Sequence, residues 1–167
     1  MQVAPGDTVA EMDAGKDPVD LAIDTKHHRL FVASSGDDES LLAYDTRTNK
    51  RVGTYPSGHF AALATDPAAG LLCALDEWGQ VALLRSTTLK RQDTLALRPG
   101  RELTIDTKRQ RLYLLHDYGI YEQNLLTGAA RTIEVEKGGG ALCADAGNRI
   151  AYVACPDSDR LVPVSLG

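Results

Sequence analysis

The chain alternates short apolar runs with polar turns, and the same phrase occurs four times. Residues 24–34, DTKHHRLFVAS, begin with a polar turn and continue into an apolar run of strand length. Aligned on the aspartate that begins the turn, the repeats start at Asp24, Asp66, Asp106 and Asp145, spaced 42, 40 and 39 residues apart. A period of about 40 residues built from short strands is typical of β-propeller blades. Almost no segment has helical periodicity, so the pattern predicts an all-β fold.

The pattern predicts a single β-propeller domain over residues 1–167, with four blades of four antiparallel strands. The blades fall near 15–57, 58–99, 100–137 and 138–167, and Gly and Pro mark the connections. The expected strands are 19–23, 29–33, 41–44 and 51–55; 61–64, 71–75, 81–84 and 92–97; 103–105, 111–115, 120–123 and 131–135; and 141–144, 149–154 and 160–164. The first aspartate of each repeat is expected to accept hydrogen bonds from backbone N–H groups in its turn, which is a structural role.

The fourth repeat ends one strand short, and a segment at the start of the chain matches the missing strand. Residues 7–12, DTVAEM, lie where the second and third repeats have QDTLAL and RTIEV. We expect this N-terminal strand to complete the C-terminal blade, because that would pair two otherwise exposed strand edges. The favoured result is a closed ring in one chain, a monomer. The alternative is a homodimer in which each chain forms half of a larger wheel.

Composition limits the classes of partner. The net charge of −5 argues against nucleic-acid binding. No apolar run reaches the length of about 18 residues that a membrane-spanning helix needs, and the first residues lack the features of a signal peptide. We therefore expect a cytoplasmic protein with no nucleic-acid or membrane partner, unless a longer parent carries an export signal. The three cysteines are odd in number and lack a CxxC spacing, which favours free thiols over disulfides.

The first repeat resembles the YVTN-type β-propeller family. That repeat has the form P-x-x-V-A-[IV]-D-P, then R-L-Y-V-[AT]-N, then V-x-V-[IY]-D-T-x-T-N-K-V. The matching residues are Pro18, Ala22, Ile23, Asp24, Arg29, Leu30, Phe31, Val32, Tyr44, Asp45, Thr46, Thr48, Asn49, Lys50 and Val52. Later repeats match less well, since RSTTLK and NLLTGA replace DTRTNK. The resemblance implies a propeller fold and a binding scaffold rather than one activity. The family usually has about seven blades, whereas four are visible here.

The loops at the two ends of the expected ring differ in charge. With the strands of a blade called a to d in chain order, the d–a and b–c loops share one face, and this face has a net negative charge. The a–b and c–d loops share the other face, which has a net positive charge. Such a separation of charge can orient charged partners. The acidic face also has the longer loops and the only tryptophan, so it is the better candidate for a binding site.

The candidate ligand-binding residues gather at strand ends on the acidic face. The loop DEWG of the second blade and the loop HDYG of the third each pair a polar residue with an aromatic one before a glycine. The connections between blades add a histidine and a glutamate. The full set is Asp76, Trp78, His116, Tyr118, His59 and Glu102. Aromatic anchors beside polar groups suit recognition of a small molecule or a protein whose identity the sequence does not specify.

These residues lead to the hypothesis of a non-enzymatic binding scaffold that uses its acidic loop face. The alternative is a small propeller lyase or lactone hydrolase, with His116 as a base and Asp76 or Glu102 beside it. No nucleophile elbow, HExxH motif or paired histidines support catalysis, so no catalytic residue is assigned. No ligand pair lies close in sequence, and the glycines at 138–140 precede a strand rather than a helix. Neither a metal nor a cofactor is therefore expected.

Overall fold

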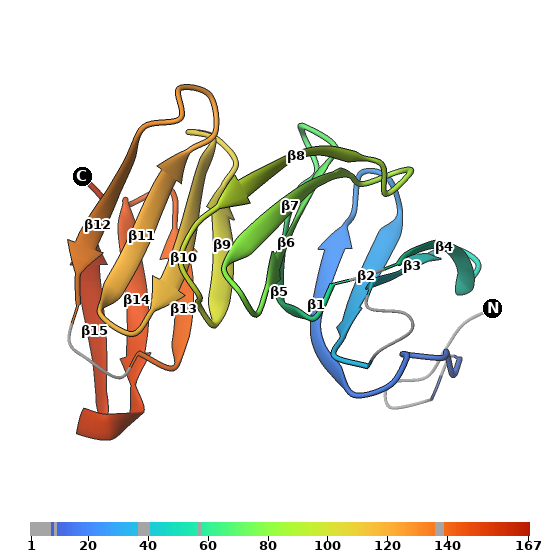
Figure 1. The fold of residues 1–167 in the computed structure, drawn as a ribbon, viewed down its shortest axis with the longest axis horizontal. Coiled ribbons are helices and arrows are strands. Elements are labelled where there is room, and N and C mark those ends of the chain that lie inside the picture. The colour runs from blue at the N-terminus through green and yellow to red at the C-terminus, as the bar shows by residue number, and fades with distance from the viewer. Residues whose placement is uncertain (1–7, 9, 37–40, 57, 136–138) are drawn as a thin grey trace.

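Four antiparallel sheets follow one another along the chain and form a four-bladed β-propeller (Figure 1). The computed structural model describes residue 8 and residues 10–36, 41–56, 58–135 and 139–167. The strands are β1 (Pro18–Asp24), β2 (Arg29–Ser34), β3 (Leu41–Asp45) and β4 (Lys50–Tyr55); β5 (Phe60–Asp66), β6 (Leu71–Asp76), β7 (Gln80–Arg85) and β8 (Arg91–Ala96); β9 (Glu102–Asp106), β10 (Arg111–His116), β11 (Gly119–Asn124) and β12 (Ala130–Glu134); and β13 (Ala141–Asp145), β14 (Ile150–Cys155) and β15 (Arg160–Ser165). The all-β, four-bladed architecture that the repeat predicts is confirmed.

The fourth blade has three strands in the part of the chain that the structure describes. Its order is β13-β14-β15, with a short 3₁₀ turn, η1 (Pro156–Ser158), between the last two. The other blades each add an outer fourth strand, namely β4, β8 and β12. The outer edge of β15 therefore lacks the neighbour that the equivalent strands β3, β7 and β11 have.

The residues just before β1, Asp13 and Ala14, lie against the first blade. Two residues of the strand expected at 7–12, Asp7 and Val9, are outside the described residues, and the others belong to no strand. The Tyr44 hydroxyl donates to the carbonyl of Asp13, and Ala14 packs on the buried cluster that contains Tyr44. The first and fourth blades stand at opposite ends of an open arc (Figure 1). Asp13 and Ala14 are therefore held at the first blade, at the other end of the arc from the edge that residues 7–12 were expected to complete.

Three apolar clusters hold the blades together, and each lies between two consecutive blades. The first contains Phe31 and Leu41 with Leu63 and Leu72; the equivalent clusters join the second blade to the third and the third to the fourth. Successive residues of a strand point to opposite faces of its sheet. An apolar run such as Leu71–Asp76 therefore contributes to two clusters, one on each face. This explains why the middle strands are apolar almost throughout rather than alternating.

An aspartate at the end of each inner strand organises the turn that follows. The carboxylate of Asp66 accepts from the N–H groups of Ala68 and Ala69 at 2.9 and 3.2 Å, and Asp106 and Asp145 make the same pair of bonds in their own turns. Asp24 accepts from the N–H of His27 at 3.0 Å. The structural role predicted for these four aspartates is confirmed.

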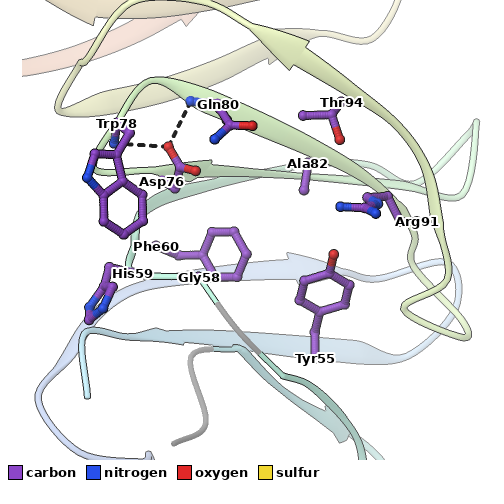
Figure 2. A pocket seen from close by; sticks show the side chains of 10 residues that line it. All are labelled: Tyr55, Gly58, His59, Phe60, Asp76, Trp78, Gln80, Ala82, Arg91 and Thr94. Carbon is purple, nitrogen blue, oxygen red and sulfur yellow. Dashed lines mark hydrogen bonds between the residues drawn. The ribbon is translucent and has the colours of Figure 1, made fainter. Parts of the chain in front are cut away.

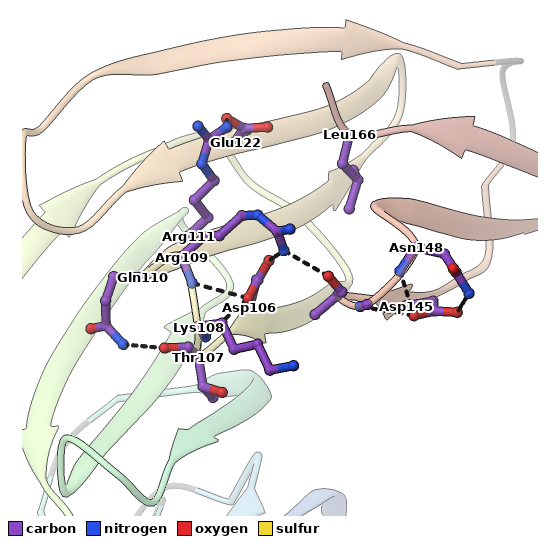
Figure 3. Close-up of polar contacts among 12 residues, drawn as sticks. Asp106, Thr107, Lys108, Arg109, Gln110, Arg111, Glu122, Asp145, Asn148 and Leu166 are labelled. Atoms are coloured by element: carbon purple, nitrogen blue, oxygen red, sulfur yellow. Dashed lines mark hydrogen bonds and ion pairs between the residues drawn. The ribbon is translucent and has the colours of Figure 1, made fainter.

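The same turns also connect neighbouring blades. The Gln110 side-chain amide in the third blade donates to the second carboxylate oxygen of Asp66 in the second blade. Arg109 pairs with Asp106 at 2.9 Å and also donates to the carbonyl of Ala146 in the fourth blade at 2.6 Å (Figure 3). Each turn therefore adds polar contacts to the apolar contacts between blades.

Replacing Asp66 by alanine should destabilise the fold by about 2 kcal/mol, because three donors would lose a buried acceptor. Asp145 is the matched control, since its carboxylate makes the same turn bonds in a more exposed setting and bonds to no other blade. Urea unfolding should show a smaller loss for Asp145→Ala than for Asp66→Ala. Equal losses would indicate that the contact between blades contributes nothing.

Candidate functional site

A groove of about 440 Å³ opens between the first and second blades on the face of the d–a and b–c loops. Its lining residues are Tyr55, Gly58, His59, Phe60, Asp76, Trp78, Gln80, Ala82, Arg91 and Thr94 (Figure 2). The link between the blades turns sharply at Gly58, which has φ +136°. A Cβ at that position would lie 2.7 Å from the Phe60 ring, so only glycine lets the link pass over this ring.

Asp76 is a structural residue of this groove. It is buried at the end of β6, and one carboxylate oxygen accepts from the backbone N–H groups of Trp78 and Gln80 at 3.0 and 2.7 Å (Figure 2). These bonds hold the turn that displays the Trp78 ring. Because the carboxylate is occupied by backbone donors, its first role is to shape the loop.

The same position ends the second strand of the other blades, and its partner is again the N–H two residues further on. His116 accepts from Tyr118 through Nδ1 at 3.3 Å, and the Ser34 hydroxyl accepts from Gly36 at 3.4 Å. The fourth position, Cys155, instead contacts the carbonyl of Val153 through its thiol. At three of these four strand ends, the different side chains therefore fill the same role of turn acceptor.

Trp78 and His59 meet at the mouth of the groove. Their ring centroids lie 5.5 Å apart with an interplanar angle of 81°, an edge-to-face contact. The Nδ1 of His59 lies 3.2 Å from the carbonyl of Ser35, which is an acceptor, so Nδ1 carries the proton. Trp78 nevertheless leaves 60% of its surface exposed. A large aromatic ring is therefore held in one orientation and offered to solvent.

The wall of the groove contains residues that the sequence did not single out. Tyr55 ends β4, and its ring lies 6.0 Å from that of Phe60. Arg91, on the outer strand β8, extends its guanidinium into the groove near Tyr55 (Figure 2). The sequence does carry a signal for this wall, which is the pair of aromatic residues at 55 and 60 on either side of the blade connection. A d–a link brings its two ends to one face, so these two rings are expected to lie together.

His116, Tyr118 and Glu102 belong to the third blade and do not line this groove. Tyr118 is 66% exposed, and its ring lies 6.5 Å from that of His116. Burial, and then the positive charge of Arg98, lower the pKa of His116, while Asp117 partly offsets them. Burial, and then the charge of Asp20, raise the pKa of Glu102.

The register of the third sheet separates the two residues proposed as an acid–base pair. Glu102 pairs with Leu115, so their side chains share one face of the blade. His116 is the next residue and points to the opposite face, and its Nδ1 is already an acceptor for Tyr118. His116 and Glu102 are therefore not brought together, and Asp76 is engaged with its own loop.

The charge difference between the two faces remains a prediction. Three acidic residues that contribute much of the negative charge, Asp37, Asp38 and Glu39, lie outside the described residues. On the opposite face the turns neutralise part of their positive charge, since Arg47 pairs with Asp45 at 2.7 Å. This pair holds the pKa of Asp45 well below its usual range.

Among the described residues, no group of three or more His, Cys, Asp or Glu side chains is arranged to hold a metal ion. The three cysteines are free: Cys73 and Cys155 are buried, and Cys143 is exposed. Burial raises the pKa of the Cys73 thiol to about 12, so this thiol stays protonated. In the part of the chain that the structure describes, no helix is long and apolar enough to cross a membrane.

Comparison with known proteins identifies the fold and no family. No protein-family model and no curated protein sequence matches the chain at a significant level. The computationally designed Ika4 protein superposes with a TM-score of 0.77 at 14% identity, over 97% of this chain and 99% of that one. A propeller from a nidogen/laminin complex gives 0.76 at 16% identity, over 89% and 59%. The WD40 repeats of RRP9 give 0.69 at 14% identity, over 90% and 51%.

These similarities define the class of protein as a β-propeller with WD40-like neighbours. The chain spans about half the length of U3-55K and RRP9, of which it covers 52% and 51%. Identities this low show the fold alone. The YVTN family remains a resemblance carried by the first repeat.

Replacing His116 by asparagine should reduce the loss of stability in acid, because asparagine retains an acceptor for Tyr118 and does not titrate. The lowered pKa of His116 means that the unfolded chain takes up a proton at a higher pH than the folded chain. The stability from the neutral ring is therefore complete above about pH 6.5 and is lost as the pH falls through the lowered pKa. Urea unfolding at about pH 7 and about pH 5 should show the larger loss for the wild type. The same loss in both proteins would refute this role.

Proposed function

We propose that this protein is a non-enzymatic binding module that holds a peptide segment or a small ligand in the groove between its first two blades. The observation that carries the proposal is Trp78, an exposed indole fixed by His59 and by the turn bonds of Asp76. An exposed tryptophan held in one rotamer loses little conformational entropy when a partner covers it. Such residues dominate the energy of many interfaces.

The rest of the groove suits a ligand with an apolar part and a polar part. Phe60 and Tyr55 provide an aromatic wall, and Arg91 can donate to a carboxylate or a carbonyl oxygen of the ligand. The groove has two walls from two blades, so it can hold an extended segment between them. Neighbouring propellers are described as WD40 repeats or as part of a nidogen/laminin complex, which supports protein binding as the class of function.

The proposed surface extends from the groove to the third blade along the same loop face. Tyr118 is a second exposed aromatic on an equivalent loop, its ring lies next to that of His116, and Glu102 begins strand β9 of the same blade. A ligand that reaches beyond the groove would meet this ring next. The acidic residues of the face would then favour a partner with basic groups at its edge.

Trp78→Ala should weaken binding of a peptide selected on the wild-type chain by roughly 30-fold or more, the effect of losing an anchor worth about 2 kcal/mol. The peptide comes from a displayed random library and is measured by its effect on fluorescence, since Trp78 is the only tryptophan. For the alanine variant, calorimetry replaces fluorescence. The melting temperature should be nearly unchanged because the indole is mostly exposed.

Leu126→Ala is the matched control, since Leu126 is 76% exposed in a turn on the opposite face. It should leave peptide binding intact, while Tyr118→Ala should weaken binding less than Trp78→Ala does. If selected peptides bind Trp78→Ala as tightly as the wild type, the groove is not the binding site.

A further inference from the structure

The first blade presents an apolar face that has no blade against it. Leu21, Leu63 and Leu103 occupy the same repeat position in the first three blades. Their partners on the neighbouring strand are Val32, Ala74 and Leu114. Leu63 and Leu103 face the preceding blade and are 5% and 7% exposed. Leu21 has no preceding blade and is 62% exposed, although Ala14 and its neighbours cover the buried cluster beside it.

The fourth blade presents the complementary face, which likewise has no blade against it among the described residues. Leu161 lies opposite Ala154 on the neighbouring strand. In the first three blades the same repeat position is held by Leu41, Val81 and Ile120, which lie opposite Ala33, Leu75 and Leu115. The residues equivalent to Leu161 in the first three blades face the following blade and are 0% exposed. Leu161 itself is 66% exposed.

Inside the chain, these two repeat positions always meet each other. Leu41 shares a cluster with Leu63, Val81 shares one with Leu103, and Ile120 shares one with Leu142. Leu161 and Leu21 are the fourth such pair, yet the strands that carry them, β15 and β1, stand at opposite ends of the arc (Figure 1). Each end face therefore lacks the contact that the opposite end face of a second copy can supply.

A hollow of about 460 Å³ lies on each of these end faces. One is lined by Val19, Leu21 and Val32 with their neighbours, and the other by Ile150 and Pro163 with theirs. The open outer edge of β15 lies at the second end as well. Unpaired strand edges and uncovered apolar faces both favour association with another chain.

We propose that two copies of this chain pack head to tail through these faces and close an eight-bladed ring. Leu161 of each copy then packs beside Leu21 of the other, which repeats the contact already made three times within the chain. A ring of two copies fits the finding that one chain covers 52% of U3-55K and 51% of the RRP9 WD40 chain. A contact between two different faces closes when the arcs complete a circle.

The ring also assigns a partner to the open edge of β15. The segment at 7–12 matches the missing outer strand in sequence, and Asp13, the residue that follows it, accepts a hydrogen bond from Tyr44 of the first blade. In the head-to-tail ring, the first blade of one copy adjoins the fourth blade of the other. The N-terminal segment of each copy is thereby placed next to the β15 edge of its partner. The groove at Trp78 lies between the first two blades, away from both contacts, so the ring and the proposed binding site are independent.

Light scattering on the purified 167-residue chain should give twice its mass of 18.0 kDa. Leu21→Glu and Leu161→Glu should each shift the chain to the monomer, while Leu126→Glu, equally exposed but on neither end face, should leave the dimer intact. Circular dichroism should be unchanged in all three, since each leucine is exposed in the single chain. A wild-type monomer, or a dimer that both end-face variants leave intact, overturns the proposal.

Mixing Leu21→Arg with Leu161→Glu tests the head-to-tail geometry. A mixed pair places both substitutions in one contact, with opposite charges, and leaves the second contact wild type. We expect the mixture to recover the doubled mass, although each variant alone is monomeric. A mixture that stays monomeric overturns the head-to-tail arrangement, because a contact between two identical faces would not be repaired in this way.

Discussion

The structure depends on one constraint, which is that each blade is a sheet with two apolar faces and both must be covered. The middle strands carry apolar residues in nearly every position, so no blade can leave a face in water without a large cost. Consecutive blades solve this by sharing a cluster, and the turn aspartates add polar contacts across the same boundary. The arc grows by adding blades, but each addition creates a new uncovered face. Only closure removes the last two faces, and in the proposed ring a second copy provides that closure.

The candidate groove arises from the same architecture. A d–a link crosses from the outside of one blade to the inside of the next, so it leaves a space between the blades at one end. The acceptor at the end of β6 then fixes the neighbouring turn and sets the direction of Trp78. Because the turn only needs an acceptor, Ser34, Asp76 and His116 can occupy equivalent positions. The scaffold is thus constant, and the exposed residue two positions later is free to serve recognition.

Much of the fold was predictable from the sequence because a repeated turn is a local signal. The aspartate followed by an apolar run marks each blade, and the four aspartates have the role that their position predicts. The segment at 7–12 was harder to place. Its residues resemble those of the outer strands, but this resemblance does not tell which sheet edge the segment reaches. Tyr44, distant in sequence, holds the adjacent residue Asp13 at the first blade.

The site was predictable only in part. Asp76, Trp78 and His59 line one groove because their loops adjoin the same connection between blades, and their role in binding stays a prediction. Tyr55 and Arg91 were missed, since they enter the groove from outer strands that sequence alone does not set side by side. Glu102 and His116 end on opposite faces of the third blade, and this follows only once the register of β9 and β10 is known, because Glu102 pairs with Leu115 rather than with His116.

The most direct measurement of the central constraint uses Cys143. This exposed thiol lies on the face of the fourth blade that points away from the third, because Leu142 and Ala144 on either side of it pack against the third blade. The other two thiols are buried, so a thiol reagent reports on Cys143 alone. If the end face is covered by a second copy, the labelling rate should be slow in concentrated protein and rise on dilution, and Leu21→Glu should label fast at every concentration. A rate that is fast and independent of concentration in the wild type would contradict the account.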